Sequence, residues 1–248
     1  MLKVDRHKKI LDEVIAHKSV ESIKLSELLE VSIDTIRRDI VELEQSGKLK
    51  RVRGGASMVP FIPSRERRET ETNNPKHVMA KKAMNLIEDG QTLIFGGGTT
   101  NLHLISLLPT DIRLTIFTNS IPIAYKLCEY PHVDGVLLGG NINNFGLTAI
   151  GYQAVEFLSE IWADYCFLGI SGVHMVFGLT ETNRSETIIQ KAFINSTDHI
   201  VALAHSSKLS SPKPYKVADI DVLDVLVTEL EPTDDVLSPF IAKGIKVL

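Results

Sequence analysis

Ser32, Thr35, Arg37 and Arg38 place two hydroxyl groups and two guanidinium groups within seven residues. Groups of these kinds hydrogen-bond to base edges and to phosphate oxygens of DNA. Thr35 and Arg38 are three positions apart, so they share one face if this stretch is helical. We therefore expect Ser32, Thr35 and Arg38 to approach base edges or nearby phosphates, and Arg37 to bind phosphate.

A basic stretch follows shortly afterwards. Residues 48–53 hold no acid and four cations, which are Lys48, Lys50, Arg51 and Arg53. Such cations bind the phosphates of DNA, which fixes position without reading sequence. The chain has a net charge of −4, yet residues 1–60 carry 12 Lys and Arg against 10 Asp and Glu. The positive field is therefore local and suits a small DNA-binding domain on an acidic body.

Two short helices with a tight turn between them would position the hydroxyl and guanidinium groups of residues 32–38. Apolar spacing over residues 25–29 predicts a helix that ends at Val31. Ser32 is a good N-cap for the next helix, because its hydroxyl accepts a free backbone N–H, and Gly47 is a good end for it. One apolar stripe of that helix is predicted to be buried, and it consists of Ile36, Ile40 and Leu43.

Alternation over residues 48–53, followed by Gly54 and Gly55, predicts a β-hairpin. The helices and the hairpin together predict a winged helix-turn-helix domain over residues 1–57. An ordinary helical hairpin in a protein core is the alternative. The cluster of Thr35, Arg37 and Arg38 beside a basic hairpin favours the DNA-binding domain.

Residues 58–75 contain three prolines and many charges, which predicts a linker. Residues 76–248 alternate short apolar stretches with helical patterns. This is typical of an α/β domain with a largely parallel sheet covered on both faces. The expected strands are residues 92–95, 114–117, 133–138, 165–170, 199–204, 222–228 and 245–248. The expected helices are residues 77–88, 100–108, 120–129, 152–161, 185–196 and 233–243.

The sequence Phe95-Gly-Gly-Gly-Thr-Thr-Asn101 joins an expected strand to an expected helix. Glycines let backbone N–H groups converge, and threonine hydroxyls add donors, so this loop is a candidate anion site. Its candidate residues are Gly97, Gly98, Thr99 and Thr100. The loop is neither a Walker A motif nor a dinucleotide fingerprint. A tight turn without a ligand is the alternative, and the loop alone does not decide between the two.

Small, donor-rich loops also follow the later strands. Ligands of open α/β sheets bind outside the carboxyl ends of the strands, so we expect a pocket for a small phosphorylated polar ligand there. Further candidate residues are Asn119, Ser120, Gly140, Gly169, Ser171, Glu181 and Lys208. Lys208 would supply a cation, although a solvated surface lysine is the ordinary alternative.

Several classes of protein are disfavoured. No apolar run reaches the ~18 residues of a membrane span, and the charged first residues lack the apolar core of a signal peptide. Two cysteines, Cys128 and Cys166, indicate buried, reduced thiols in a cytoplasmic protein. No side chains have the spacing of metal ligands or of a Ser/His/Asp triad. We therefore expect no metal, no cofactor and no catalytic residue.

Residues 19–56 resemble the DNA-binding domain of the DeoR family of bacterial transcriptional regulators. The motifs that carry this resemblance are Leu25-Ser-Glu-Leu-Leu-Glu-Val-Ser32, Thr35-Ile-Arg-Arg-Asp-Ile40, Leu43-Glu-Gln-Ser-Gly47 and Arg53-Gly-Gly-Ala56. The similarity covers almost the whole chain. It continues through Gly97-Gly-Thr-Thr100, Thr118-Asn-Ser120, Gly139-Gly140, Asp164, Gly178-Leu-Thr180 and Ser206-Ser-Lys208.

The resemblance implies a sensor domain of the ribose-5-phosphate-isomerase-like fold with a phosphorylated sugar or sugar-like effector. It also implies repression of a carbohydrate operon through operator DNA, altered by that effector. Two positions depart from the family pattern, since Gly96 and His205 stand where the family usually has acids. Paired half-sites on DNA mirror protein symmetry, so we expect a homodimer or homotetramer.

Two rival functions remain. A sugar-phosphate isomerase or deaminase fused to a DNA-binding domain would need positioned carboxylates as acid and base. Gly96 and His205 occupy positions where acids would be wanted, which leaves Glu181 and Glu186 as the nearby candidates. The other rival is a DNA-binding protein whose second domain serves oligomerisation alone.

Overall fold

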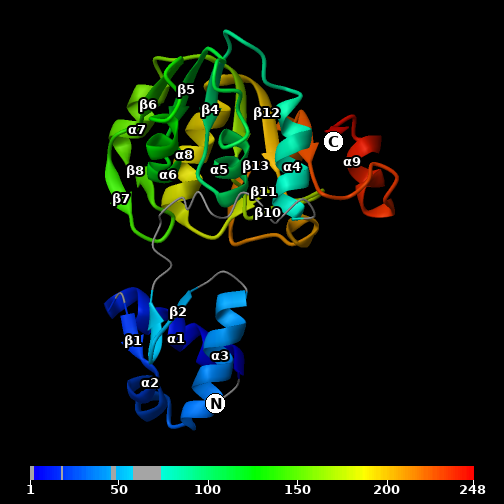
Figure 1. Cartoon of the computed structure of the whole chain (residues 1–248). Coiled ribbons are helices and arrows are strands. Elements are labelled where there is room, and N and C mark those ends of the chain that lie inside the picture. Colours follow the sequence, from blue (N-terminus) through cyan, green and yellow to red (C-terminus); the bar gives the residue numbers. More distant parts are fainter. Residues whose placement is uncertain (1–2, 18, 46–48, 58–73) are drawn as a thin grey trace. The chain divides into compact units, whose positions relative to one another are not determined.

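The computed structural model describes residues 3–17, 19–45, 49–57 and 74–248. The chain divides into two compact units, which lie within residues 1–62 and 63–248 and are called the head and the body below (Figure 1). Most of the linker predicted for residues 58–75 lies outside the described residues. Asn74 and Pro75 are described, and they begin the first helix of the body.

The head contains three helices and a small antiparallel sheet. Its elements are α1 (Lys3–His17), β1 (Ser19–Glu21), α2 (Ser22–Leu29), α3 (Ile33–Gln45), β2 (Lys50–Val52) and β3 (Gly55–Ser57). The strands pair in the order β1-β3-β2. Helix α2, the turn and helix α3 form the helix-turn-helix, and β2 and β3 form the wing, as the sequence predicts. The predicted helix end at Gly47 lies outside the described residues.

Apolar side chains from every part of the head form its core. The predicted stripe of α3 is buried in it, and the core consists of Ile10, Val14, Leu25, Leu29, Ile36, Ile40, Leu43, Leu49 and Ala56. Because the stripe occupies one face of α3, the opposite face of this helix is left to solvent. Arg37 and Arg38, two of the residues predicted to contact DNA, are exposed on this helix.

Gly55 belongs to strand β3, so its assignment to the turn is wrong. The turn consists of Arg53 and Gly54, and Gly54 has a φ of +87°. Gly55 pairs with Glu21 of β1, and a Cβ on Gly55 would lie 2.1 Å from the carbonyl oxygen of Val20. The close approach of β1 to β3 therefore requires glycine at position 55.

Seven parallel strands form the main sheet of the body. In spatial order they are β15 (Lys246–Val247), β14 (Val225–Val227), β12 (Thr197–Leu203), β9 (Ala163–Leu168), β4 (Thr92–Phe95), β5 (Leu114–Thr118) and β6 (Val133–Leu137). Every neighbouring pair is parallel. The carboxyl ends of all seven strands therefore lie at one edge of the sheet. The expected α/β fold with a parallel sheet is confirmed.

Helices cover both faces of this sheet (Figure 1). Alternate strand residues, such as Leu93 and Phe95, pack against α4 (Pro75–Met84), α5 (Thr99–Ile105) and α6 (Ile121–Leu127). Residues between them, such as Ile94, pack against α7 (Tyr152–Leu158), α8 (Arg184–Ile194) and α9 (Ser238–Ala242). This alternation follows from the pleat of a strand, and it explains why the strands are apolar throughout.

Five short strands were not predicted. Strands β7 (Asn141–Asn143) and β8 (Thr148–Ile150) form a hairpin, and β10 (Gly172–His174), β11 (Gly178–Glu181) and β13 (Tyr215–Ala218) form an antiparallel sheet. Each has only three or four residues, and β13 pairs with a strand more than thirty positions earlier. Such strands form because a partner is available and not because of a local pattern. Glu181, which was placed in a loop, lies in β11.

The expected burial of both cysteines is half right. Cys166 lies on the central strand β9 and is fully buried, and this burial raises the pKa of its thiol. Cys128 follows helix α6 and is exposed. Cys128 lies three positions after the exposed Tyr125, on the side of the helix that faces solvent.

We predict that Gly55→Ala destabilises the head by more than about 2 kcal/mol, because the new Cβ would collide with the backbone of β1. Gly54→Asn is the matched control. No atom lies within 4 Å of a Cβ built on Gly54, and Asn tolerates its left-handed backbone at a cost of roughly 1 kcal/mol. Denaturant titration followed by circular dichroism would measure both. Equal losses for the two variants would contradict the prediction.

Candidate functional site

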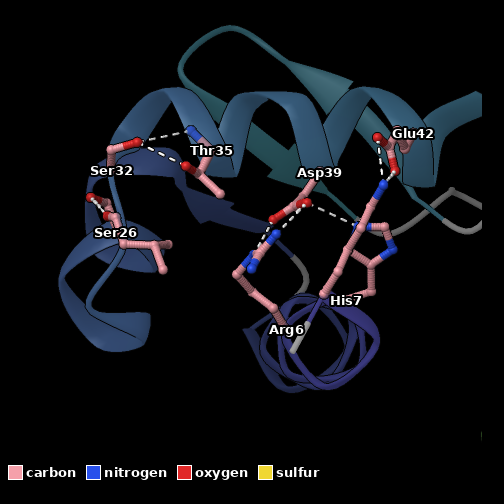
Figure 2. A network of polar contacts seen from close by, with 9 residues as sticks. Arg6, His7, Ser26, Ser32, Thr35, Asp39 and Glu42 are labelled. Carbon is pink, nitrogen blue, oxygen red and sulfur yellow. Dashed lines mark hydrogen bonds and ion pairs between the residues drawn. The ribbon is translucent and has the colours of Figure 1, made fainter. Parts of the chain in front are cut away.

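The turn between α2 and α3 is held by two serine hydroxyls (Figure 2). Ser32 caps α3, since its Oγ accepts the backbone N–H of Thr35 at 3.2 Å, and the two side-chain hydroxyls are 2.8 Å apart. Ser26 of α2 donates to the carbonyl oxygen of Val31 at 2.6 Å. Glu30 has a φ of +52°, which turns the chain sharply without glycine. The start of α3 is therefore held in one orientation relative to α2.

The two arginines of α3 differ in their surroundings. Both side chains are exposed. Arg37 forms an ion pair with Asp34, one turn earlier, at 3.2 Å. Within the described residues Arg38 has no ion-pair or hydrogen-bond partner, so its guanidinium is available to a ligand. Arg38 lies on the side of α3 opposite the buried stripe, whereas Thr35 is half-buried at the edge of that side.

Asp39 fixes the rotation of α3 against α1 (Figure 2). Its carboxylate is 2% exposed and accepts hydrogen bonds from Arg6 at 2.5 and 3.0 Å, and His7 Nε2 lies 3.0 Å from it. Burial raises the pKa of Asp39, but the hydrogen bonds and charges of Arg6 and His7 outweigh burial, and the net pKa lies below its usual value. Asp39 thus pairs with a cation, and the pair is largely removed from solvent.

The wing presents cations beside α3. Lys50, Arg51 and Arg53 are exposed. Glu44 of α3 accepts a hydrogen bond from the backbone N–H of Arg51 at 2.8 Å, and this bond joins the wing to α3. Arg37, Arg51 and Arg53 line a groove between α3 and the wing. Lys48, the remaining predicted phosphate ligand, lies outside the described residues.

In the body, the parallel sheet brings the predicted effector residues to one edge. Gly97, Gly98, Thr99 and Thr100 follow β4, Asn119 and Ser120 follow β5, Gly140 follows β6, Gly169 and Ser171 follow β9, and Lys208 follows β12. Neighbouring strands are about 4.8 Å apart, so the loops after β9, β4 and β5 lie side by side, with those after β12 and β6 at the two ends of the row. Gly169 packs directly on the glycine loop, since a Cβ on Gly169 would lie 1.6 Å from the carbonyl oxygen of Gly97.

Several of these residues also have structural tasks. Ser120 caps α6, and its Oγ accepts the N–H of Ile123 at 3.4 Å. Gly140 allows the β7–β8 hairpin to approach, because a Cβ there would lie 2.4 Å from the carbonyl oxygen of Ile150. Gly96 is buried, and a Cβ on it would lie 3.3 Å from the backbone nitrogen of Gly169. A side chain at position 96 would therefore need its neighbours to shift by a few tenths of an ångström.

Three buried side-chain amides hold these loops in place by hydrogen bonds to backbone carbonyl oxygens. Asn101 donates to the carbonyl oxygens of Gly96 and Phe167, both at 2.9 Å, and it thereby joins the glycine loop to β9. Asn119 donates to Ala149, and Gln190 of α8 donates to Gly169. The side-chain oxygens of all three amides are buried without a protein partner. Asn101 and Gln190 were not predicted, although Asn101 directly follows the glycine loop.

Glu181 is a buried acceptor at the same edge. It is 6% exposed and accepts hydrogen bonds from the hydroxyl of Ser171, from Thr182 and from Gln190. A second acid, Glu186, accepts hydrogen bonds from Asn143 at 2.8 Å and from the hydroxyl of Thr148. Glu186 thereby joins the β7–β8 hairpin to α8. Both carboxylates are held in place by neutral donors.

Lys208 brings positive charge to this edge. Its amine is half-buried and donates to the carbonyl oxygen of Ile170 at 2.7 Å. Burial lowers the pKa of Lys208, the charge of Glu181 opposes this, and Lys76 and Lys213 lower it further. Three lysines therefore gather here, of which the sequence indicates Lys208 alone. An anion would relieve the repulsion among them.

His205, the second departure from the family pattern, has a carboxylate beside it. Its Nδ1 accepts the backbone N–H of Ser207 at 3.1 Å, and its Nε2 lies 3.2 Å from Glu229, which follows β14. Burial raises the pKa of Glu229, but hydrogen bonds from Ser206 and Thr228 outweigh burial and lower it overall. Glu229 was not predicted, because it is 24 positions away from His205 in the sequence.

Family comparisons agree with both units. Residues 6–60 match the DeoR-like helix-turn-helix domain, and residues 71–230 match the DeoR C terminal sensor domain. Fold and site thus define a two-domain regulator with a winged helix-turn-helix and a sensor domain. The chain belongs to the DeoR family of transcriptional regulators.

Relatives of similar length carry names of the same kind. The chain is 30% identical over 236 residues to the HTH-type transcriptional regulator GolR of Listeria innocua, covering 92% of this chain and 91% of GolR. It is 29% identical over 251 residues to the HTH-type transcriptional repressor GlcR of Bacillus subtilis, covering 100% and 96%. It is 27% identical over 227 residues to the HTH-type transcriptional repressor CsqR of Escherichia coli, covering 90% and 87%.

Solved structures show more distant likenesses. Ribose 5-phosphate isomerase A from Methanocaldococcus jannaschii is 20% identical, with a TM-score of 0.40 over 54% of this chain and 53% of that one. Translation initiation factor eIF-2B from Pyrococcus horikoshii is 13% identical, with a TM-score of 0.44 over 92% and 82%.

Neither a membrane helix nor a metal cluster is found in the part of the chain that the structure describes. None of its helices is both long and apolar enough to cross a bilayer. Its His, Cys, Asp and Glu side chains form no group of three or more that could hold a metal ion.

We predict that Asp39→Ala destabilises the head by roughly 3 kcal/mol, because it leaves the largely buried Arg6 without its counter-charge. Asp34→Ala is the control, since the pair of Asp34 with Arg37 is exposed and is worth less than about 1 kcal/mol. Denaturant titration of the full chain would measure both.

The same ion pair sets a pH dependence. The folded-state pKa of Asp39 is lowered, so its contribution to stability is complete above its unfolded pKa of about 4 and is lost as the pH falls through the folded value. Between pH 5 and pH 2, the stability difference between wild type and Asp39→Ala should shrink. A difference that stays constant over this range would contradict the assignment.

Proposed function

We propose that the chain is a repressor of carbohydrate-metabolism genes that binds operator DNA through the head and a phosphorylated sugar or similar metabolite through the body. The observation that supports the first half best is the pair of exposed arginines on α3: Arg38 has its guanidinium available, and Arg37 lines a groove with Arg51 and Arg53 of the wing. The chromosome is the site of action, so we place the protein in the cytoplasm.

We assign base reading and phosphate binding to different residues of the head, according to the contacts that each residue makes. Arg38 has its guanidinium available and lies on the outward face of α3 with Ser32 and Thr35, so these three are proposed to read base edges. Arg37 and the wing cations Lys50, Arg51 and Arg53 are proposed to bind phosphates, together with Lys48. Phosphate contacts give affinity and salt dependence, whereas base contacts give specificity.

The effector site is proposed at the carboxyl edge of the parallel sheet. Lys208, with Lys76 and Lys213 nearby, favours an anion beside the glycine loop. Glu181 and the three buried amide oxygens supply acceptors of the kind that sugar hydroxyls need. Protein groups that can donate hydrogen bonds to a phosphate and groups that can accept them from sugar hydroxyls lie at the same edge of the sheet. This combination fits a phosphorylated sugar better than a purely apolar ligand.

Regulation requires that the effector bind two arrangements of the protein with different affinity. Helix α4 begins at Pro75 and bears Lys76, which is close enough to lower the pKa of Lys208. An anion bound at Lys208 would therefore act on the first helix of the body. We propose that this contact carries the signal toward the head.

Enzymatic turnover is not part of the proposal. Glu181 and Glu186 are the acids that an isomerase or deaminase mechanism would have to use, and both are occupied by neutral donors. Release of product from ribose 5-phosphate or glucosamine 6-phosphate by the purified protein would overturn this assignment.

Arg38→Ala should weaken binding to DNA from the promoter of the protein's own gene by about 1–3 kcal/mol, while leaving binding to random duplex nearly unchanged. Arg37→Ala is the matched control and should weaken both alike, with a salt dependence lower by about one ion. Fluorescence anisotropy at several salt concentrations would measure this. Unchanged operator affinity for Arg38→Ala would exclude a base contact.

Lys208→Gln should abolish the stabilisation of the body by a sugar phosphate. A ligand at about 100 times its Kd adds about 2.7 kcal/mol, or several degrees in Tm. Thermal unfolding would be compared with ribose 5-phosphate, glucosamine 6-phosphate and inorganic phosphate as probes. Lys191→Gln, an exposed lysine on α8, should behave as wild type. A ligand-induced shift that survives in Lys208→Gln would place the anion elsewhere.

A further inference from the structure

One surface segment of the body carries no charge. Residues 135–155 contain no Asp, Glu, Lys, Arg or His, although Asp, Glu, Lys and Arg make up 23% of the chain. This segment covers the end of β6, the β7–β8 hairpin and the start of α7. Surface segments are normally rich in charge, so a neutral one of this length needs a reason.

The segment also exposes large apolar side chains. The exposed fraction is 48% for Leu137, 61% for Ile142, 87% for Phe145 and 72% for Tyr152, and Phe157 just beyond it is 42% exposed. These five residues are called the apolar patch. Its three aromatic residues together expose the equivalent of about two whole side chains, or roughly 300–500 Å².

The apolar patch lies at an open edge of the main sheet. β6 is the last strand of that sheet, and among the described residues its outer edge pairs with no strand. Figure 1 shows β6, β7, β8 and α7 on the same side of the body. The edge strand at the opposite end, β15, has only two residues. Long exposed edges are usually covered or protected by charge.

We propose that the apolar patch is the interface between two copies of this chain. A stable dimer buries about 800 Å² per partner, and the aromatic residues alone supply about half of this. In a two-fold interface each residue near the axis meets its own copy, so a charge there would repel itself. The neutral segment avoids this repulsion, and homodimer interfaces are depleted in charge at their centre.

A second copy also fits the DNA-binding function. One head offers one recognition helix, and helix-turn-helix proteins read paired half-sites as dimers. The proposal goes beyond the DNA and effector sites, and it can be tested without either ligand. Its failure would therefore leave the proposed function standing.

Two variants test the interface in the full chain. Phe145→Glu and Ile142→Glu each place a negative charge on the apolar patch, where the two-fold axis would oppose it with its own copy. We expect wild type to sediment with at least the mass of two 27.5 kDa chains, and both variants to dissociate at least 100-fold more readily. Val176→Glu, at a residue 76% exposed in the β10–β11 turn, is the control and should associate as wild type does.

Analytical ultracentrifugation between 1 and 50 μM would measure these masses, and circular dichroism would show that each variant is folded. A monomeric wild type at 50 μM would overturn the proposal and leave the patch to a different protein partner. Wild-type association by both Phe145→Glu and Ile142→Glu, or dissociation by Val176→Glu as strong as theirs, would also overturn it.

Discussion

A recognition helix can read DNA only if one of its faces is fixed outward, and in this protein a buried ion pair helps to fix it. The carboxylate of Asp39 is almost fully buried, which is costly unless a counter-charge accompanies it. Arg6 of α1 supplies that counter-charge, and His7 Nε2 lies 3.0 Å from the same carboxylate. The ion pair and the apolar stripe together hold α3 against α1, and this leaves Thr35 and Arg38 to face outward. Readout of DNA therefore depends on a helix that is itself expected to make no base contact.

The body depends on a different constraint, the parallel direction of its seven strands. Parallel strands place the loops that follow them at one edge of the sheet. Residues as far apart in sequence as Gly97 and Glu229 therefore lie at the same edge. Close backbone contacts then decide details. A side chain on Gly169 would collide with the backbone of Gly97, and Gly96 has little free space around it. The carboxylate missing at position 205 is instead brought to His205 by Glu229, from the next strand of the sheet.

Membership of the DeoR family joins these two halves into one function. In the proposed function, residues of α3 give specificity and cations of the wing give affinity. The body has two different surfaces. One is the sheet edge that includes Lys208 and favours an anion, and the other is a neutral apolar surface at the β6 end of the sheet. These surfaces differ in charge because their proposed partners differ: DNA phosphates, a small anion and an identical chain. The head surface and the apolar patch each come from one short stretch of sequence, whereas the anion-favouring edge gathers residues that are distant in sequence.

Local pattern was enough to determine the winged helix-turn-helix, the parallel α/β fold and the exposed face of α3. Apolar spacing in helices and apolar runs in buried strands are properties of the chain itself, and the exposure of Arg38 follows from them. Tertiary structure decided the rest. Asp39 is buried because α1 brings Arg6 to it, and Gly55 is a strand residue because β1 approaches it. At the carboxyl edge of the sheet, where the effector site is proposed, Lys76, Lys213 and Glu229 arrive from distant positions in the sequence. Contacts between residues far apart in sequence carry no periodic signal, so only the folded chain shows them.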